Sequence, residues 1–210
     1  GSEMCIRDSQ RTIRVILCHE QKKIGVRELA KLAKISVGSA AKELARLEKI
    51  GYLEKSKNKY KLVEWEDLLN AFAYTTSIKE IEPIQFIAAE RPGYVMKKIS
   101  STKLEYAFTA FTAAELVSPE YIADKLYLYI REDQKEEWEE FLRKQGMVKG
   151  EKGNILLYPV EEQYFYGTQE IRRFKVVCLA QLYADLFSIS ALGRGLSKKL
   201  LEVIRSVRSS

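Results

Sequence analysis

The sequence predicts a protein of α+β, or mixed α/β, structure in two parts: a small basic module at the N-terminus and a larger α/β domain after it. The chain has 210 residues, enough for two small domains. Residues 9–63 hold fourteen Lys and Arg against five Glu, a net charge of +9, whereas residues 64–210 have a net charge of −2. The apolar pattern also changes near Tyr74, from short helices with a hairpin to alternating strands and helices. We therefore predict one domain over residues 9–74 and a second over residues 75–210.

The N-terminal module begins with a predicted helix. Apolar residues recur at helical spacing over residues 10–19, a short β-prone segment follows at 24–26, and residues 27–34 predict a second helix. Residues 3–9 fit none of these elements, and we interpret them as a leader. The module therefore begins as helix, short strand and helix.

A third helix is predicted over residues 40–50, after a short polar connection at 35–39. Ser36 can cap its start, and Gly51 follows its last turn as a C-terminal glycine. Two short helices joined by a tight polar turn predict a helix-turn-helix, whose second helix enters the major groove of DNA. The inward stripe of this helix is predicted to be Val37, Ala41, Leu44, Leu47 and Ile50.

The outward face of the third helix has the side chains that DNA contacts require. The small residues Gly38 and Ser39 allow close approach to the DNA backbone. Lys42 and Arg46 point the same way and can reach guanine or phosphate. Glu43 either accepts a hydrogen bond from cytosine or holds Arg46 in position. The residues predicted to contact DNA from the turn and this helix are Ser36, Gly38, Ser39, Lys42, Glu43, Arg46 and Lys49.

A lysine-rich β-hairpin is predicted directly after the third helix, because apolar and polar residues alternate over 52–55 and 60–63 around a turn-forming tip at 56–59. Four lysines recur here at every second position: Lys55, Lys57, Lys59 and Lys61. This period predicts that they share one face, from which the first three contact DNA phosphates. The whole order of elements resembles the winged helix-turn-helix domains of prokaryotic transcription regulators. The alternative is a winged helix that contacts another protein.

The rest of the chain alternates between helices and strands, which describes an α/β domain. Residues 75–77 predict a short linker before it. Helices are predicted over residues 65–74, 94–100, 106–117, 134–145, 178–192 and 196–207. Strands are predicted over residues 84–89, 125–131, 155–160 and 174–177.

The sequence contains little that predicts catalysis. Its one histidine, His19, lies in the N-terminal module, so neither a zinc site nor a histidine-based triad is predicted in the α/β domain. Cys5, Cys18 and Cys178 have no metal or redox spacing, and we expect free thiols in a reducing cytoplasm. No apolar run approaches the ~20 residues of a membrane helix. We therefore expect a cytoplasmic protein with no enzyme activity, no cofactor, no metal and no contact with a membrane.

The stretch Gly193-Arg194-Gly195 falls short of a phosphate-binding loop. It lacks the third glycine of a dinucleotide loop and the Gly-Lys-Ser/Thr of a P-loop, and it follows a helix. We interpret it as a turn between two helices, with Gly193 at the end of the first. Asp185 and Arg194 are predicted to stabilise this turn by pairing or capping.

A winged helix followed by an α/β domain that ends in LYADLFSISALGRGLSKKLLEVI is similar to the AbiEi family, the antitoxins and transcriptional regulators of type IV toxin–antitoxin systems. The residues that match the family's late motif are Tyr183, Asp185, Leu186, Gly193, Arg194 and Gly195. The family's usual glycine before this motif is Leu192 here. The resemblance implies that the winged helix binds inverted repeats in double-stranded promoter DNA and represses its own operon, and a homodimer would fit such repeats. It also implies that the second domain neutralises a nucleotidyltransferase-like toxin without a stable complex.

Two other functions are consistent with the sequence. A ligand-responsive winged-helix regulator would need a closed apolar pocket with a few polar groups in its C-terminal domain. A nucleic-acid-processing enzyme that uses Asp185 as a metal ligand would need a second carboxylate close to Asp185.

Overall fold

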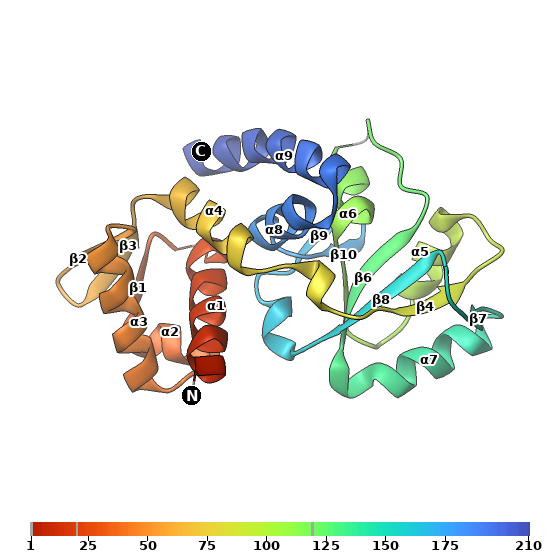
Figure 1. Cartoon of the computed structure of the whole chain (residues 1–210), viewed down its shortest axis with the longest axis horizontal. Coiled ribbons are helices and arrows are strands. Elements are labelled where there is room, and N and C mark those ends of the chain that lie inside the picture. Colours follow the sequence, from red (N-terminus) through yellow and green to blue (C-terminus); the bar gives the residue numbers. More distant parts are fainter. Residues whose placement is uncertain (1, 20, 119) are drawn as a thin grey trace.

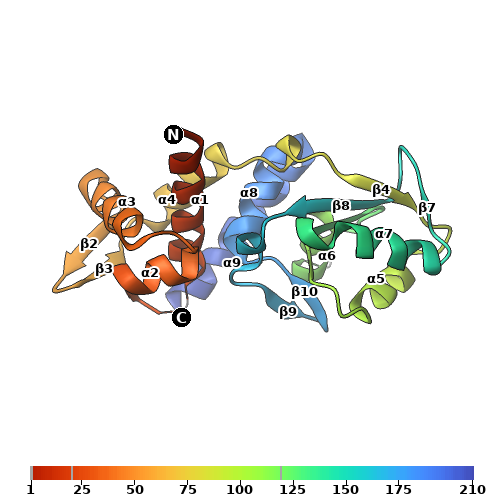
Figure 2. The ribbon, with the colours of Figure 1, turned by 90° about the horizontal axis from the view of Figure 1, so that it is seen from below.

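The computed structural model describes residues 2–19, 21–118 and 120–210 and has the predicted mixed α/β fold (Figure 1). A small group of helices with a hairpin forms one end of the molecule, and a larger sheet with its helices forms the other. The same arrangement is visible from below (Figure 2). Buried apolar side chains of both parts belong to one continuous core. None of the helices in the described residues is both long and apolar enough to cross a membrane.

The N-terminal part has the elements that the sequence predicts, in the predicted order. They are α1 (Ser2–Cys18), β1 (Lys23–Gly25), α2 (Val26–Ala33), α3 (Val37–Ile50), β2 (Leu53–Ser56) and β3 (Lys59–Leu62). Its three strands pair antiparallel in the order β1-β3-β2. The helix α4 (Trp65–Thr75) leads from this part into the rest of the chain.

The ends of α3 agree with the prediction. Ser36 precedes the helix, and its side chain accepts a hydrogen bond from the backbone N–H of Ser39 at 3.0 Å. Gly51 follows the helix with a φ of 106°, in the left-handed region that glycine tolerates best. The two residues therefore fix where α3 begins and ends.

Two expectations for the N-terminal part are wrong. Residues 3–9 are not a separate leader, because α1 begins at Ser2 and continues through them. The inward stripe of α3 is Ala40, Leu44 and Leu47, whereas the predicted Val37, Ala41 and Ile50 are exposed. Val37 and Ile50 stand in the terminal turns of the helix, where apolar spacing alone does not show that no partner helix covers them.

The C-terminal part is built on a seven-stranded sheet, counted over the described residues, with strand order β7-β4-β8-β6-β5-β10-β9. The pairs β6–β8 and β5–β10 are parallel, and the other pairs are antiparallel. The strands are β4 (Ile84–Ile87), β5 (Tyr106–Phe108), β6 (Leu126–Arg131), β7 (Val148–Lys149), β8 (Ile155–Val160), β9 (Gln169–Ile171) and β10 (Phe174–Val176). The helices are α5 (Pro92–Ser100), α6 (Ala110–Val117), α7 (Lys135–Lys144), α8 (Leu179–Ile189) and α9 (Ala191–Ser209). Three short 3₁₀ turns complete the chain: η1 (Ile78–Glu80), η2 (Glu132–Gln134) and η3 (Glu162–Phe165).

Residues 106–117 are not one helix, as predicted, but the strand β5 followed by α6. The change occurs at Ala110, whose φ of 48° lies in the left-handed region. Small apolar residues dominate on both sides of it, so the sequence pattern does not separate a buried strand from a buried helix.

Gly193-Arg194-Gly195 is not a turn between helices, because α8 already ends at Ile189. Ser190 caps the next helix by accepting a hydrogen bond from the N–H of Gly193 at 3.1 Å. The three residues therefore lie in the first turn of α9. Gly193 is the point of close contact, since a Cβ there would lie 2.5 Å from the carbonyl oxygen of Leu186 in α8.

We expect Gly193→Ala to lower the free energy of unfolding by about 1–3 kcal/mol, because the new methyl group would push α9 away from α8. Gly195→Ala is the matched control. A Cβ at Gly195 meets nothing within 4 Å, and alanine favours helix by about 0.5–1 kcal/mol. Urea denaturation of the two variants tests this, and equal stability of both would contradict the close α8–α9 contact.

Cys18 and Cys178 are joined by a disulfide, so the expectation of three free thiols holds only for the exposed Cys5. The two residues are 160 positions apart in the sequence. The last residue of α1 and the residue before α8 nevertheless lie together in the fold, with their Cα atoms 6.1 Å apart. Sequence spacing gives no sign of such a long-range contact.

Candidate nucleic-acid interface

The outermost ridge of α3 is basic and free. Gly38, Lys42, Ala45 and Lys49 recur at helical spacing on the face opposite the buried Ala40, and all four are exposed. Among the described residues, neither Lys42 nor Lys49 has an acidic partner within ion-pair distance. Figures 1 and 2 both place α3 at the end of the molecule remote from the larger sheet. This ridge is therefore open to a large partner.

Arg46 lies on the flank of α3 and is engaged. Its Nη2 donates to Oε2 of Glu43 and to Oγ of Ser9 in α1, each at 2.9 Å. The side chain is still 44% exposed. Of the two roles suggested for Glu43, the structure shows the one that holds Arg46 in position. The lysines of the ridge, not Arg46, are the cations that need no rearrangement to meet DNA.

The hairpin lysines do not share one face, as the alternation predicted. Lys55 pairs with Tyr60 and lies on the inner face, with its ammonium 5.6 Å from the centre of the Tyr60 ring. Lys59 and Lys61 lie on the outer face, where Lys61 stands beside Lys23 of β1. The two-residue turn at Lys57 and Asn58 shifts the alternation between the strands, because Lys57 forms the tip with a φ of 58°.

The hairpin nevertheless adds to the same basic end. Its four lysines are exposed, and in the described part of the chain none is ion-paired. The outer sheet face gains Lys23, and only Glu54 on that face is acidic. Lysines that no carboxylate neutralises are the groups that replace counterions on a phosphate backbone.

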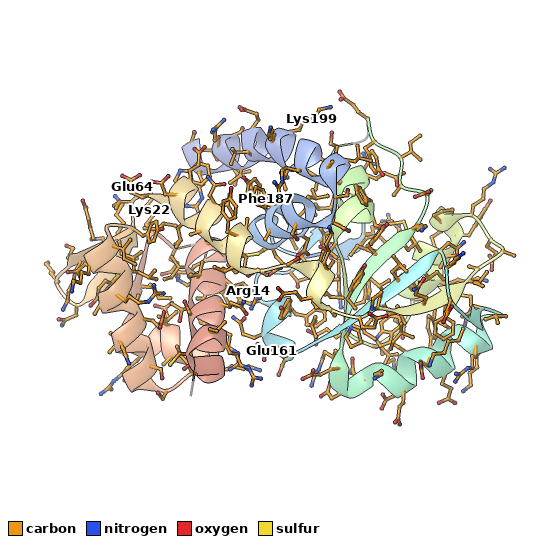
Figure 3. All side chains as sticks on the ribbon, viewed as in Figure 1. Arg14, Lys22, Glu64, Glu161, Phe187 and Lys199 are labelled. Atoms are coloured by element: carbon orange, nitrogen blue, oxygen red, sulfur yellow. A yellow bond between two sulfur atoms is a disulfide. The ribbon has the colours of Figure 1, made fainter. Side chains whose placement is uncertain are left out.

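A second set of polar residues lies between the two parts of the molecule, around Arg14 of α1 (Figure 3). Its side chain is only 1% exposed. The guanidinium donates to Oε1 of Gln181 in α8 at 2.9 Å and to Oε1 of Gln163 in η3. It also stacks 4.1 Å from the centre of the Tyr164 ring. Arg14 thus turns inward to the C-terminal part.

Asp185 completes this buried set. Its carboxylate accepts hydrogen bonds from Gln181, Thr109 and Tyr129, the last two through hydroxyl groups. Burial raises the pKa of Asp185 to about 6, although these hydrogen bonds and the charge of Arg14 act to lower it. Burial likewise lowers the pKa of Arg14. Asp185 is therefore a structural acceptor in a closed network.

We expect the raised pKa of Asp185 to make wild type gain stability relative to Asp185→Asn as the pH falls. The folded carboxyl holds its proton up to about pH 6, whereas 3.8 is its ordinary pKa. The contribution is thus fully present below about pH 4 and is lost as the pH rises through 6. Between pH 7 and pH 5 the gain should be about 1 kcal/mol. Urea denaturation at both pH values checks it, and parallel pH profiles would contradict it.

Asp185 and Arg194 do not pair, contrary to the prediction. Arg194 donates to the backbone carbonyl of Phe187 at 3.0 Å and lies 4.2 Å from the centre of the Phe187 ring. Phe187 itself is labelled in Figure 3. The two residues belong to different surroundings, since Asp185 faces the buried network and Arg194 the surface of α9.

The surroundings of Asp185 also fail to provide a second acid for metal binding. Its hydrogen-bond partners are neutral, and Arg14 is the nearby charge. Across the described residues no group of three or more His, Cys, Asp and Glu side chains is placed to hold a metal ion.

The cavities bear on the ligand-sensing alternative. The apolar cavity between α6, α8 and α9 has a volume of about 50 Å³, lined among others by Leu182, Leu186 and Leu200. Binding sites for drug-sized molecules span roughly 300–1,000 Å³. A larger surface cavity of about 630 Å³ lies between the end of α1 and the start of α8, and it is lined by charged as well as apolar residues. Neither is the closed apolar pocket of a metabolite sensor.

A basic module of helices and a hairpin, joined to a mixed α/β body without a cluster of catalytic groups in its described residues, is typical of transcriptional regulators. A family model described as "Transcriptional regulator, AbiEi antitoxin, Type IV TA system" matches residues 61–196, from β3 into α9. The chain therefore belongs to the AbiEi antitoxin family of type IV toxin–antitoxin systems. The match leaves out α1, α2 and α3, so the basic ridge is known from this chain alone. No curated protein and no solved structure matches the chain.

Proposed function

We propose that this protein is a cytoplasmic, sequence-specific DNA-binding regulator that represses its own operon. One observation carries the proposal: the unpaired lysines of α3 and of the β2–β3 hairpin lie on one end of the molecule, away from the C-terminal part. A helix of this exposure fits the major groove, and the hairpin then meets the phosphates beside it. Two copies of the chain would occupy the two halves of an inverted repeat.

Within this proposal Lys42 reads base edges, while Lys57 and Lys59 supply affinity. Lys42 lies near the N-terminal end of α3, the part of a recognition helix that usually meets the bases, with Gly38 one turn before it. Arg46 can join it only by leaving Glu43 or Ser9. Ser36, Ser39 and Lys49 complete the contact surface as predicted.

The test is a titration of the DNA upstream of the gene over a salt series. We expect Lys42→Ala to reduce the preference for the operator over unrelated DNA by about tenfold, because a base contact is worth roughly 1–3 kcal/mol. Lys57→Ala should weaken both DNAs equally and lower the salt slope by about one. Lys152→Ala, an exposed lysine in the C-terminal part, is the control. An affinity that ignores both salt and the hairpin lysines would exclude the proposal.

We also infer that the C-terminal part neutralises a nucleotidyltransferase-like toxin. The family match supports this, since it lies mainly on that part of the chain. Co-expression with a toxin encoded by the adjacent gene should restore growth, and residues 75–210 carry the activity. If the neighbouring gene product is harmless, or if the antitoxin does not relieve its toxicity, this inference fails while the DNA-binding proposal stands.

A further inference from the structure

The Cys18–Cys178 disulfide joins the two parts of the molecule at the edge of their contact. Cys18 is the last residue of α1, and Cys178 directly precedes α8. The same two helices are joined deeper in the fold by the hydrogen bond from Arg14 to Gln181. The disulfide therefore closes the outer end of a contact that the buried network holds from within.

Solvent can reach this bond. Both cysteines line the surface cavity of about 630 Å³, together with Lys22 and Arg208. No Asp or Glu side chain lines this cavity. Gly167, with a φ of 75°, closes over the bond from one side, where a Cβ would lie 2.9 Å from the Cβ of Cys18 and 3.0 Å from that of Cys178. A small anionic thiol can thus approach from the cavity side, toward the two cations.

The two sulfur atoms differ as leaving groups. Cys178 is the residue that precedes the first turn of α8, and thiolates at a helix N-terminus are stabilised. Cys18 follows a helix C-terminus, which gives its thiolate no such stabilisation. Thiol–disulfide exchange proceeds fastest when the more stable thiolate leaves.

We propose that Cys18–Cys178 is a thiol–disulfide exchange site for small anionic thiols, which sets how firmly α1 is held to α8. The incoming thiolate attacks Sγ of Cys18, the S–S bond breaks, and Cys178 leaves as a thiolate. A second thiol then attacks the mixed disulfide on Cys18 and releases it. In total two small thiols are oxidised to one disulfide, and the protein disulfide takes up two electrons and two protons. This proposal does not depend on the proposed function.

The consequence of the reaction is local. The buried set around Arg14 and Asp185 remains intact when the disulfide opens, because it makes no contact through either cysteine. The last turn of α1 and the first turn of α8 lose their covalent link. The opened form is therefore a folded protein with a looser edge between its two parts.

The experiment equilibrates the folded protein with glutathione and glutathione disulfide in varied ratios, blocks free thiols with iodoacetamide and measures the intact mass. We expect one blocked cysteine under oxidising conditions, which is Cys5, three under reducing conditions, and a reversible change between the two. Cys5→Ser should give zero and two. In Cys178→Ser, Cys18 alone should take up one glutathione. Hydrogen exchange should rise on reduction only at the end of α1 and the start of α8.

Two outcomes would overturn the proposal. If all three cysteines are blocked in the oxidised folded protein, the pair is not bonded. If the pair resists every thiol concentration until the protein is denatured, the bond is structural and closed to exchange. Hydrogen exchange that is unchanged at both helix ends after proven reduction would remove the second half of the proposal, that the bond sets how firmly α1 is held.

Discussion

Arg14→Ala is expected to lower the free energy of unfolding by about 3–5 kcal/mol, the cost of breaking a buried charged network by removing one member. The side chain is buried, and its loss leaves Gln163 and Gln181 each without a donor. Asp185 loses the cation that stabilises its charge. The ring of Tyr164 loses the guanidinium stacked on it, and a cavity remains between α1 and α8.

Two further variants separate these causes. Arg7→Ala removes an exposed arginine from the same helix and should change stability by no more than about 0.5 kcal/mol. Arg14→Met fills most of the space without the charge, so its loss should fall between the other two. Urea denaturation of all three gives the comparison. If Arg14→Ala is as stable as Arg7→Ala, the guanidinium does not hold the two parts together.

The largest effect on binding is expected when four free lysines are replaced together by glutamine: Lys42, Lys49, Lys57 and Lys59. Each lost phosphate contact lowers the logarithm of the affinity by about 0.7 at 0.15 M salt, so operator affinity should fall by about a thousandfold. The salt slope should decrease by about three to four over the same change. Fluorescence anisotropy at four salt concentrations measures both quantities.

The same variant separates DNA binding from toxin neutralisation. All four side chains are exposed, so the variant should unfold at the same urea concentration as wild type. A toxin co-expressed with it should still be neutralised, because the changes lie outside the C-terminal part. Loss of both activities in a stably folded variant would show that the basic end also serves the toxin, and full operator affinity would show that DNA binds elsewhere.

Local sequence signals predicted the local structure of the N-terminal part. Ser36 and Gly51 act through their own hydrogen bonds and backbone angles, so their positions mark both ends of α3 without knowledge of the rest of the fold. The basic hairpin was equally readable, since alternation and a turn-forming tip depend only on neighbours. What these signals could not give is the rotation of α3, because its packing partners are set by the tertiary fold.

The long-range features had no local signal. Arg14 counts as one more positive charge in a basic segment, and only the fold shows that it is buried against residues about 150 positions later in the chain. Cys18 and Cys178 are in the same position. Gly193 was recognised as special, but for a chain reversal instead of a helix contact, because glycine serves both purposes and sequence does not distinguish them.

The cations that α1 and α2 present to the C-terminal part have a consequence for how such proteins evolve. Arg11 and Lys34 pair with Glu161 and Glu162, and Arg14 enters the network between them and α8. A gene fusion that moved the first 74 residues onto another body would leave these three charges without partners. The DNA-binding end is thus not an interchangeable cassette, and a new operator specificity is reached more readily by substitutions on the ridge of α3 than by exchange of the whole module.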